Sequence, residues 1–212
     1  MRYIQDRWLE NYQMLRFPCV GQYNIPVISP EPFVDVEWVS YNCARTSTNR
    51  AAKGVHFFID DYQFERVWRD FKREGKLLRE FGACMTPEFS MYTDFPKAMQ
   101  IYNHYRRHFI GAYLQHEGVK VIPSLCWSDE KSLDWCFDGE PVGSCVAISS
   151  VGTQRHLESR RLFKYGYDAM CERLKPETII FYGEVPKECR GNIVRIRAFQ
   201  EKFRKAKISD YT

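Results

Sequence analysis

Short apolar runs rich in β-branched and aromatic residues alternate along this chain with longer amphipathic stretches. Runs of this length and composition are typical of strands buried inside a sheet. They lie at residues 37–44, 55–60, 82–86, 119–125, 144–149 and 178–182.

The amphipathic stretches between these runs have the periodicity of helices. In the clearest stretch, residues 96–115, the side chains of Met99, Tyr102 and Phe109 recur at helical spacing, and Pro96 suits a first helical turn. The same reasoning predicts helices over residues 62–80, 129–137 and 154–174.

Strands that alternate with helices of this length form right-handed crossover units, so the sheet should be mainly parallel. The sequence therefore predicts an α/β fold built from repeated β-α units. A partial or irregular (β/α) barrel is the favoured architecture, because polar residues follow nearly every strand, as they do where strand ends surround a common site. A doubly wound open sheet is the alternative, and it would concentrate those polar residues at one switch point.

Residues 1–36 depart from this alternation. Prolines at 18, 26, 30 and 32 interrupt a helix-like start at 3–15 and a short extended run at 25–29. We interpret residues 1–36 as an N-terminal extension packed on the core, and residues 37–212 as a single α/β domain with a basic C-terminal helix.

Composition narrows the class of protein. The chain has 212 residues, of which 44% are hydrophobic and 27% charged, a balance typical of an ordinary globular domain. The net charge of +4 falls short of that of a protein that coats nucleic acid. The excess of positive charge is concentrated in the C-terminal tail, which we expect to form a solvated helix face. Alternatively, the tail contacts nucleic acid through Arg195, Arg197, Lys202, Arg204 and Lys205.

The N-terminus is polar from the start, and no apolar run reaches the roughly 18 residues of a membrane span. These features predict a cytoplasmic protein without a membrane partner. The eight cysteines are scattered, with no Cys-x-x-Cys pair, so buried reduced thiols are expected in place of disulfides or a zinc finger.

Carboxylates follow several of the predicted strands. Asp60 and Glu88 each follow an apolar run, and general acid/base chemistry needs two carboxyl groups in different environments. We predict Asp60 and Glu88 as the catalytic pair, with Asp94 and Asp129 in support. Asp94 and Asp129 also precede helices, where each would serve as an ordinary N-cap.

Other polar and aromatic residues at the strand ends are candidates for ligand binding. The segment AISSVGTQRH runs from a strand into a helix and resembles a phosphate-binding loop, although a simple capped turn explains it equally well. The aromatic side chains could stack on a base or sugar. The candidate ligand-binding residues are Asn42, Arg45, Tyr92, Trp127, Ser149, Ser150, Gly152 and Glu184.

Metal and thiol chemistry have weaker support in the sequence. A carboxylate cluster could hold Mg²⁺ or Mn²⁺, but the spacing of these carboxylates is not diagnostic of a metal site. His104 and His108 are best explained as part of a solvated basic helix face. Cys126 follows a strand, but no histidine in the sequence is placed to activate it as a nucleophile.

Several long segments occur in the order of one known family: FFIDDYQFERVW, PEFSMYTDFPKAMQIYNHYR, GAYLQHEGVKVIPSLCWSDEKSLDWCFDGEP, AISSVG and LKPETIIFYGEVP. Through them, residues 35–191 resemble domain of unknown function 4417, a family found in bacteria, phages and mobile elements. The resemblance implies a setting in a bacterial or phage-infected cell, and it implies no particular activity.

These features lead to two functional hypotheses. The first is a carboxylate-dependent hydrolase or transferase that acts on a nucleotide, nucleic acid or other phosphate-bearing ligand at the carboxyl ends of the strands. The second is a non-catalytic accessory protein that binds a nucleotide signal, nucleic acid or a host protein. The sequence leaves the oligomeric state open.

Overall fold

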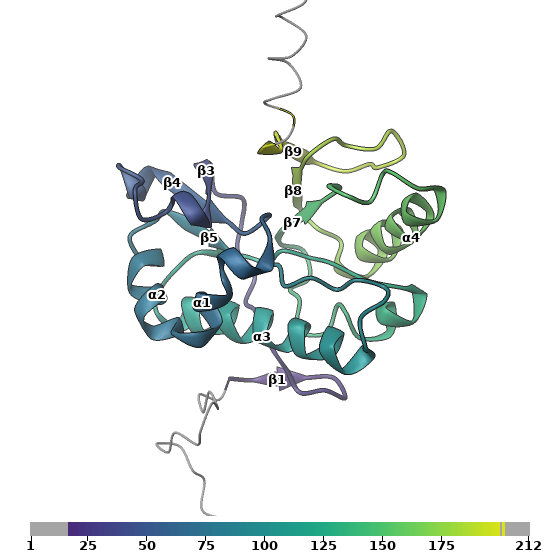
Figure 1. Cartoon of the computed structure of the whole chain (residues 1–212), viewed down its shortest axis with the longest axis horizontal. Helices are drawn as coiled ribbons and strands as arrows, with labels where there is room; N and C mark the ends of the chain where they lie inside the picture. Colours follow the sequence, from purple (N-terminus) through teal and green to yellow (C-terminus); the bar gives the residue numbers. More distant parts are fainter. Residues whose placement is uncertain (1–16, 200, 202–212) are drawn as a thin grey trace, which may run out of the picture.

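The computed structural model describes residues 17–199 and 201 (Figure 1). Its strands are β1 (Cys19–Val20), β2 (Ile25–Pro26), β3 (Glu37–Ser40), β4 (Lys53–His56), β5 (Ala83–Met85), β6 (Val121–Ile122), β7 (Cys145–Ser149), β8 (Thr178–Tyr182) and β9 (Ile193–Ile196). Its α-helices are α1 (Glu65–Arg69), α2 (Phe71–Leu78), α3 (Lys97–His116) and α4 (Leu157–Leu174), and 3₁₀ turns span Tyr41–Cys43, Arg50–Ala52, Asp61–Gln63 and Glu130–Asp134.

The parallel strands follow one another in space in the order of the sequence. One sheet has the order β3-β4-β5-β6 and the other has the order β7-β8-β9. A parallel bridge between Ser124 and Ala147 joins the two sheets just beyond β6. This order, without a reversal, is that of a barrel, and it differs from a doubly wound sheet, in which the order reverses.

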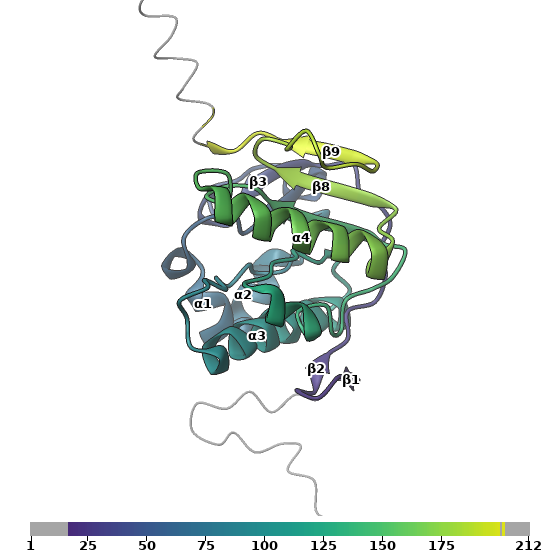
Figure 2. The ribbon, with the colours of Figure 1, turned by 90° about the vertical axis from the view of Figure 1, so that its right-hand side faces the viewer.

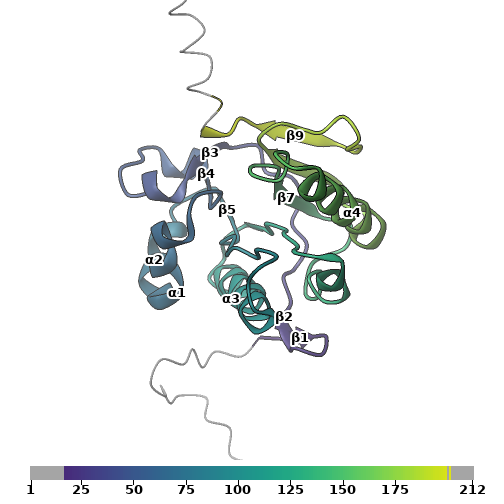
Figure 3. The same cartoon turned by 45° about the vertical axis from the view of Figure 1, so that its right-hand side comes forward.

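The barrel is incomplete, because β3 and β9 are not paired with each other among the described strands. Figure 3 shows the strands curving around a common centre with α2, α3 and α4 outside them. The predicted α/β class with a partial, mainly parallel barrel is therefore confirmed.

Alternate residues of the strands point to opposite faces of the curved sheet, as the pleat requires. On β8, Ile179 and Phe181 face outward toward α4, whereas Ile180 and Tyr182 face inward. The inward residues form one buried cluster: Phe58, Met85, Ile122, Cys145, Ala147, Ile180, Tyr182 and Ala198. The interior is thus a packed core.

Helices cover the outer face in two groups. The side chains of α1, α2 and α3 pack on β4, β5 and β6, and those of α4 pack on β7 and β8 (Figure 2). The hairpin of β1 and β2 lies against α3, where the ring nitrogen Nδ1 of His108 donates to the Pro26 carbonyl at 2.8 Å. No helix in the described part of the chain has both the length and the apolar character needed to cross a bilayer.

Three predicted elements differ from the structure. The helix expected over residues 62–80 is divided into α1 and α2, because Asp70 leaves the helical conformation and its carboxylate accepts from the backbone N–H of Arg73. The segment 129–137 holds a 3₁₀ turn in place of an α-helix. The first predicted strand ends at Ser40, and residues 41–43 form a 3₁₀ turn.

The strand β9 was not predicted from the sequence. This strand lies within the region assigned to a basic C-terminal helix, and it pairs in parallel with β8. The remainder of that predicted helix, and the helix-like segment at residues 3–15, lie outside the described residues.

Candidate functional site

A cavity of about 420 Å³ lies at the carboxyl ends of the strands. The segments that follow β4, β5, β6 and β7 contribute to it, together with the first turns of α4 and the end of β8. Its lining is Phe58, Ile59, Asp60, Glu88, Ser90, Met91, Tyr92, Thr93, Leu125, Cys126, Trp127, Ser128, Ser149, Val151, Gly152, Thr153, Ser159, Leu162, Phe163 and Tyr182. This is the position at which parallel α/β folds bind ligands.

Glu88 is a half-buried carboxyl group in the cavity lining, between the core residues Pro87 and Phe89. Among the described residues no group donates a hydrogen bond to its side chain. Burial raises the pKa of Glu88 to about 8; the positive charge of Arg107 opposes this shift, and the negative charge of Asp61 adds to it. Glu88 is therefore protonated at neutral pH.

This raised pKa predicts how stability depends on pH. Between about pH 4.3, where an unfolded glutamate ionises, and pH 8, folded Glu88 holds a proton that the unfolded chain has lost. The contribution of Glu88 to stability is therefore complete below this window and falls as pH rises through it. We expect Glu88→Gln to remove this fall, and to be about 1–3 kcal/mol more stable than the wild type at alkaline pH. Urea unfolding of both proteins across this pH range measures the difference, and parallel curves would contradict it.

Asp60 and its neighbour Asp61 have different roles. Asp60 is exposed and lines the cavity, with Nε2 of Gln63 at 3.4 Å from its carboxylate. Asp61 accepts from the backbone N–H and the hydroxyl of Ser90, at 3.0 and 2.8 Å. Asp61 therefore ties the segment after β4 to the segment after β5. This tie holds Asp60 and Glu88 on one cavity.

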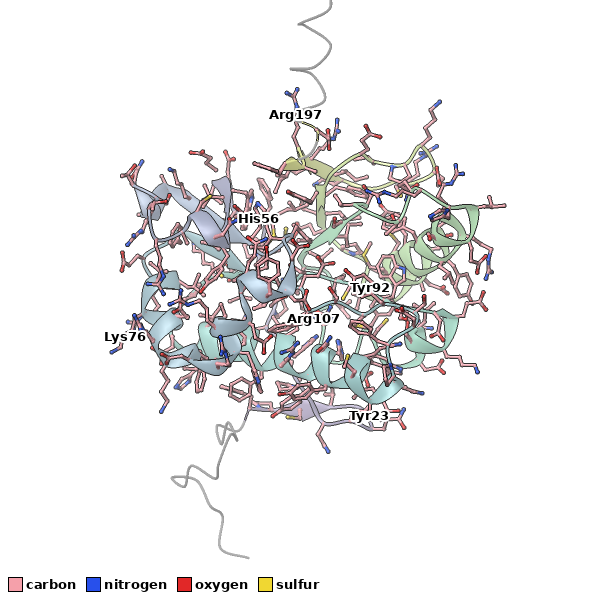
Figure 4. All side chains as sticks on the ribbon, in the orientation of Figure 1. Tyr23, His56, Lys76, Tyr92, Arg107 and Arg197 are labelled. Carbon is pink, nitrogen blue, oxygen red and sulfur yellow. The ribbon has the colours of Figure 1, made fainter. Side chains whose placement is uncertain are left out.

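Aromatic rings form much of the cavity wall. The indole N–H of Trp127 donates to the Leu162 carbonyl at 3.1 Å, which fixes the ring against α4. Phe58 and Tyr182 stack with their centroids 4.9 Å apart. Tyr92 is exposed in the loop between β5 and α3 (Figure 4). The wall thus offers flat apolar surfaces beside the two carboxyl groups.

The loop after β7 uses most of its hydroxyl groups internally. The Ser149 hydroxyl accepts from the backbone N–H of Val151 at 3.1 Å, and the Thr153 hydroxyl donates to the Ser150 carbonyl at 2.9 Å. Gly152 has a φ of +84°, which a glycine adopts without strain. Ser149 and Gly152 line the cavity, whereas the buried Ser150 donates to the Glu184 carbonyl at 2.6 Å and lies outside the lining.

Six predicted residues are not among those that line the cavity: Asn42, Arg45, Asp94, Asp129, Ser150 and Glu184. Arg45 instead forms a salt bridge with the buried Glu74 of α2 at 2.5 Å. Asn42 bonds the side chains of Ser40 and Gln63. Asp129 accepts from the Ser132 backbone at 2.9 Å and is an N-cap, the alternative that its sequence position allowed. Asp94 and Glu184 are exposed.

The predicted basic tail is described only at its start. Arg195 belongs to β9, where its guanidinium donates to the Gly183 carbonyl at 2.8 Å and pairs with Glu201 at 2.5 Å. Arg197 is exposed, far from α3 (Figure 4). Lys202, Arg204 and Lys205 lie outside the described residues, so a nucleic-acid contact through this tail stays a prediction.

A buried polar cluster on α3 lies next to the cavity. Arg107 is 1% exposed and extends from α3 into the interior (Figure 4). Its guanidinium donates to Sγ of Cys126 at 2.8 Å, Nδ1 of His104 at 2.6 Å and Oε1 of Glu140 at 3.2 Å. His104 and His108 are fully buried, so the prediction that they belong to a solvated helix face is wrong.

The hydrogen bonds of this cluster fix its protons. The Nε2 atom of His104 faces the Asp138 carbonyl, which can only accept, so Nε2 carries the hydrogen and Nδ1 accepts from Arg107. Burial, with the nearby His108 and Arg107, holds the pKa of His104 well below its usual range. One proton lies between Nε2 of His108 and Oε1 of Glu140, because two lone pairs would repel at 2.9 Å.

His104, His108 and Glu140 also place three ligand atoms within 4.8 Å of one another, an arrangement that could hold a metal ion. Arg107 donates to two of these three residues, at Nδ1 of His104 and Oε1 of Glu140, so its guanidinium supplies the positive charge of this cluster. The residues present therefore fit a buried ion-pair network better than they fit a metal.

The sequence analysis did not identify the buried role of Arg107, or Phe58 and Phe163 as residues of the cavity lining. The signal for Arg107 was present in the spacing of α3: Gln100, Asn103, His104, Arg107, His108 and Gly111 recur on one face, and all are buried. A polar stripe at helical spacing that faces the core indicates a buried network.

The chain belongs to the family described as domain of unknown function (DUF4417), whose family model matches residues 17–200. That range is wider at both ends than the segments that carried the resemblance. The chain is 39% identical over 173 residues to the Gene 1 protein of Mycobacterium phage L5, covering 81% of this chain and 76% of that protein.

A second relative is the Gene 1 protein of Mycobacterium phage D29, which is 36% identical over 173 residues. The match covers 81% of this chain but 64% of the D29 protein, so the chain spans just under two thirds of that relative. No solved structure matches.

Proposed function

We propose that this protein is a carboxylate-dependent hydrolase or transferase, with Glu88 as general acid and Asp60 as general base or charge-stabilising group. The observation that carries the proposal is that both carboxyl groups line one cavity in different environments. Glu88 is half-buried and has no hydrogen-bond donor among the residues that the structure describes, whereas Asp60 is exposed.

The chemistry follows from this difference. A protonated carboxyl at neutral pH can give its proton to a leaving group, and burial supplies that state at Glu88. The exposed Asp60 can accept a proton from water or stabilise positive charge that develops on the substrate. The aromatic wall would hold a flat part of the ligand beside both groups.

If the ligand carries a phosphate group, we expect that group to lie outside the cavity. Within residues 17–199 and 201, no lysine or arginine lines the cavity. The hydroxyl groups of Ser149 and Thr153 are engaged within their own loop. A phosphate group would therefore find little positive charge within the lining.

The test is turnover of nucleosides, nucleotides and short oligonucleotides, followed by mass spectrometry of the products. We expect Glu88→Gln and Asp60→Asn each to lower the rate by about 100-fold or more. The wild-type rate should fall above pH 8 as Glu88 loses its proton. Asp94→Asn, which removes an exposed carboxylate outside the lining, is the matched control and should leave the rate unchanged.

Equal losses in the Asp94 control, or full activity in Glu88→Gln, would contradict the proposal. A ligand that binds in the cavity and is recovered unchanged would favour the second hypothesis, a non-catalytic binding protein that uses the same cavity.

A further inference from the structure

We propose that the cavity binds an uncharged nucleobase, with the Glu88 carboxyl and the Ser128 hydroxyl contacting the edge of the base and the aromatic wall contacting its face. This inference names the substrate class of the proposed function and rests on it for the location of the site. The base could belong to a free nucleoside or to a single strand of nucleic acid, and the chemistry of recognition is the same.

The described residues that line the cavity include no lysine or arginine. The nearest buried cation is Arg107, whose guanidinium is already engaged with Cys126, His104 and Glu140. The exposed Arg161 is paired with Glu158 and Glu130. An anionic group placed inside the cavity would lose its hydration without a compensating charge, so the group inside should be neutral.

Much of the cavity wall is aromatic. Rings from Phe58, Trp127, Phe163 and Tyr182 line a space of about 420 Å³, which lies in the range of ordinary small-molecule sites. Stacking on such rings is the sequence-tolerant way in which proteins hold single bases. A flat heterocycle uses these surfaces more fully than a sugar does, because a sugar ring carries hydroxyl groups that need many partners.

One buried hydroxyl of the lining is left unpaired. Ser128 is 4% exposed, lines the cavity, and has a hydroxyl without a hydrogen-bond partner in the described part of the chain. Over the same residues, no group donates a hydrogen bond to the Glu88 carboxyl. A buried hydroxyl left unpaired costs stability, so its partner is expected to come from outside the protein.

The protonation of Glu88 then selects the ligand. A neutral carboxyl group offers one donor and one acceptor side by side, and the edge of a nucleobase offers an adjacent acceptor and donor in the same plane. Ionised Glu88 would lose the donor. The charged or titratable groups that act on Glu88 are Arg107 on α3, Asp61 after β4 and Cys126 after β6.

The test measures binding, without requiring turnover, by isothermal titration calorimetry of the full chain. The probes are adenosine, cytidine, guanosine and uridine, their 5′-monophosphates, methyl glucoside and a short single-stranded oligonucleotide. At about pH 6 we expect at least one nucleoside to bind below about 1 mM, with its monophosphate within about threefold. For adenosine and cytidine, whose bases keep their charge over this range, the affinity at about pH 9.5 should fall about tenfold or more, because the carboxyl has lost its proton.

Glu88→Gln is the decisive variant, because an amide presents a donor and an acceptor at every pH. Its affinity for the nucleoside should therefore be the same near neutral pH and at alkaline pH, in contrast to the wild type. Ser128→Ala should weaken binding about three- to tenfold at both pH values. An oligonucleotide that binds more tightly than the nucleoside would identify nucleic acid as the source of the base.

The inference is overturned if no nucleoside binds, if methyl glucoside or a monophosphate binds more than about tenfold tighter, or if the alkaline loss persists in Glu88→Gln. Failure of the proposed catalysis gives a different result: the nucleoside binds with this pH dependence and is recovered intact.

Discussion

Replacement of Arg107 by methionine is expected to lower the free energy of unfolding by about 3–5 kcal/mol, the usual cost of removing one partner of a buried ion pair. Arg107 is 1% exposed, and its guanidinium donates to Cys126, His104 and Glu140. Methionine fills much of the same volume, but it leaves the His104 lone pair without a donor and the Glu140 carboxylate with His108 as its remaining partner. Urea unfolding followed by circular dichroism measures the loss.

The control for this prediction is Arg160→Met, because Arg160 is exposed on α4. That change should stay within about 0.5 kcal/mol of the wild type. Glu140→Gln should partly offset Arg107→Met when the two are combined, with a coupling of about 1–3 kcal/mol. An Arg107→Met protein that unfolds like the Arg160 control would show that the cluster does not need its cation.

Replacement of Gly166 by alanine is expected to destabilise the protein by about 1–3 kcal/mol, as overpacking of a core does. In an ordinary helix interior the same change stabilises by about 1 kcal/mol. Here a Cβ atom on Gly166 would lie 2.2 Å from Nε1 of Trp127 and 2.3 Å from its Cε2 atom. The indole would have to move, and its hydrogen bond to the Leu162 carbonyl would be lost.

Because Trp127 lines the cavity, the Gly166→Ala protein should also bind any cavity ligand more weakly. Thermal unfolding and tryptophan fluorescence report the two effects. In a Trp127→Leu background the clash is removed, so Gly166→Ala should there be neutral or stabilising. A stabilised Gly166→Ala protein in the wild-type background would mean that α4 and Trp127 are not in close contact.

The apolar runs predicted the parallel strands β4 to β8 because most residues of these strands are buried, whereas β3 is an edge strand whose residues are partly exposed. β9 was not predicted, because its apolar residues Ile193, Val194 and Ile196 lie among arginines in a basic stretch. Its strand conformation comes from pairing with β8, a long-range contact with no local signal. The break between α1 and α2 has a local cause, since Asp70 competes for the backbone as an N-cap, but the apolar periodicity on either side hides it.

The candidate site was predictable to the extent that it depends on strand ends. Asp60, Glu88, Tyr92, Trp127, Ser149 and Gly152 all line the cavity. The contacts of Arg45 and Asp61 could not be predicted in this way, because their partners Glu74 and Ser90 lie far along the chain. A polar residue after a strand can bind the protein as readily as it binds a ligand, and only the tertiary structure separates the two cases.

The joint between the two sheets has a mechanical consequence. Five residue pairs of β7 and β8 are in register, whereas the described backbone pairing between the β3-β6 half and the β7-β9 half is the one bridge between Ser124 and Ala147. Side chains from both halves, among them Phe58 and Tyr182, meet in one buried cluster and hold the halves together. The cavity lies where the two halves meet, with Glu88 on one half and Phe163 on the other. A ligand that contacts both residues would therefore cross-link the halves and raise the unfolding temperature of the protein.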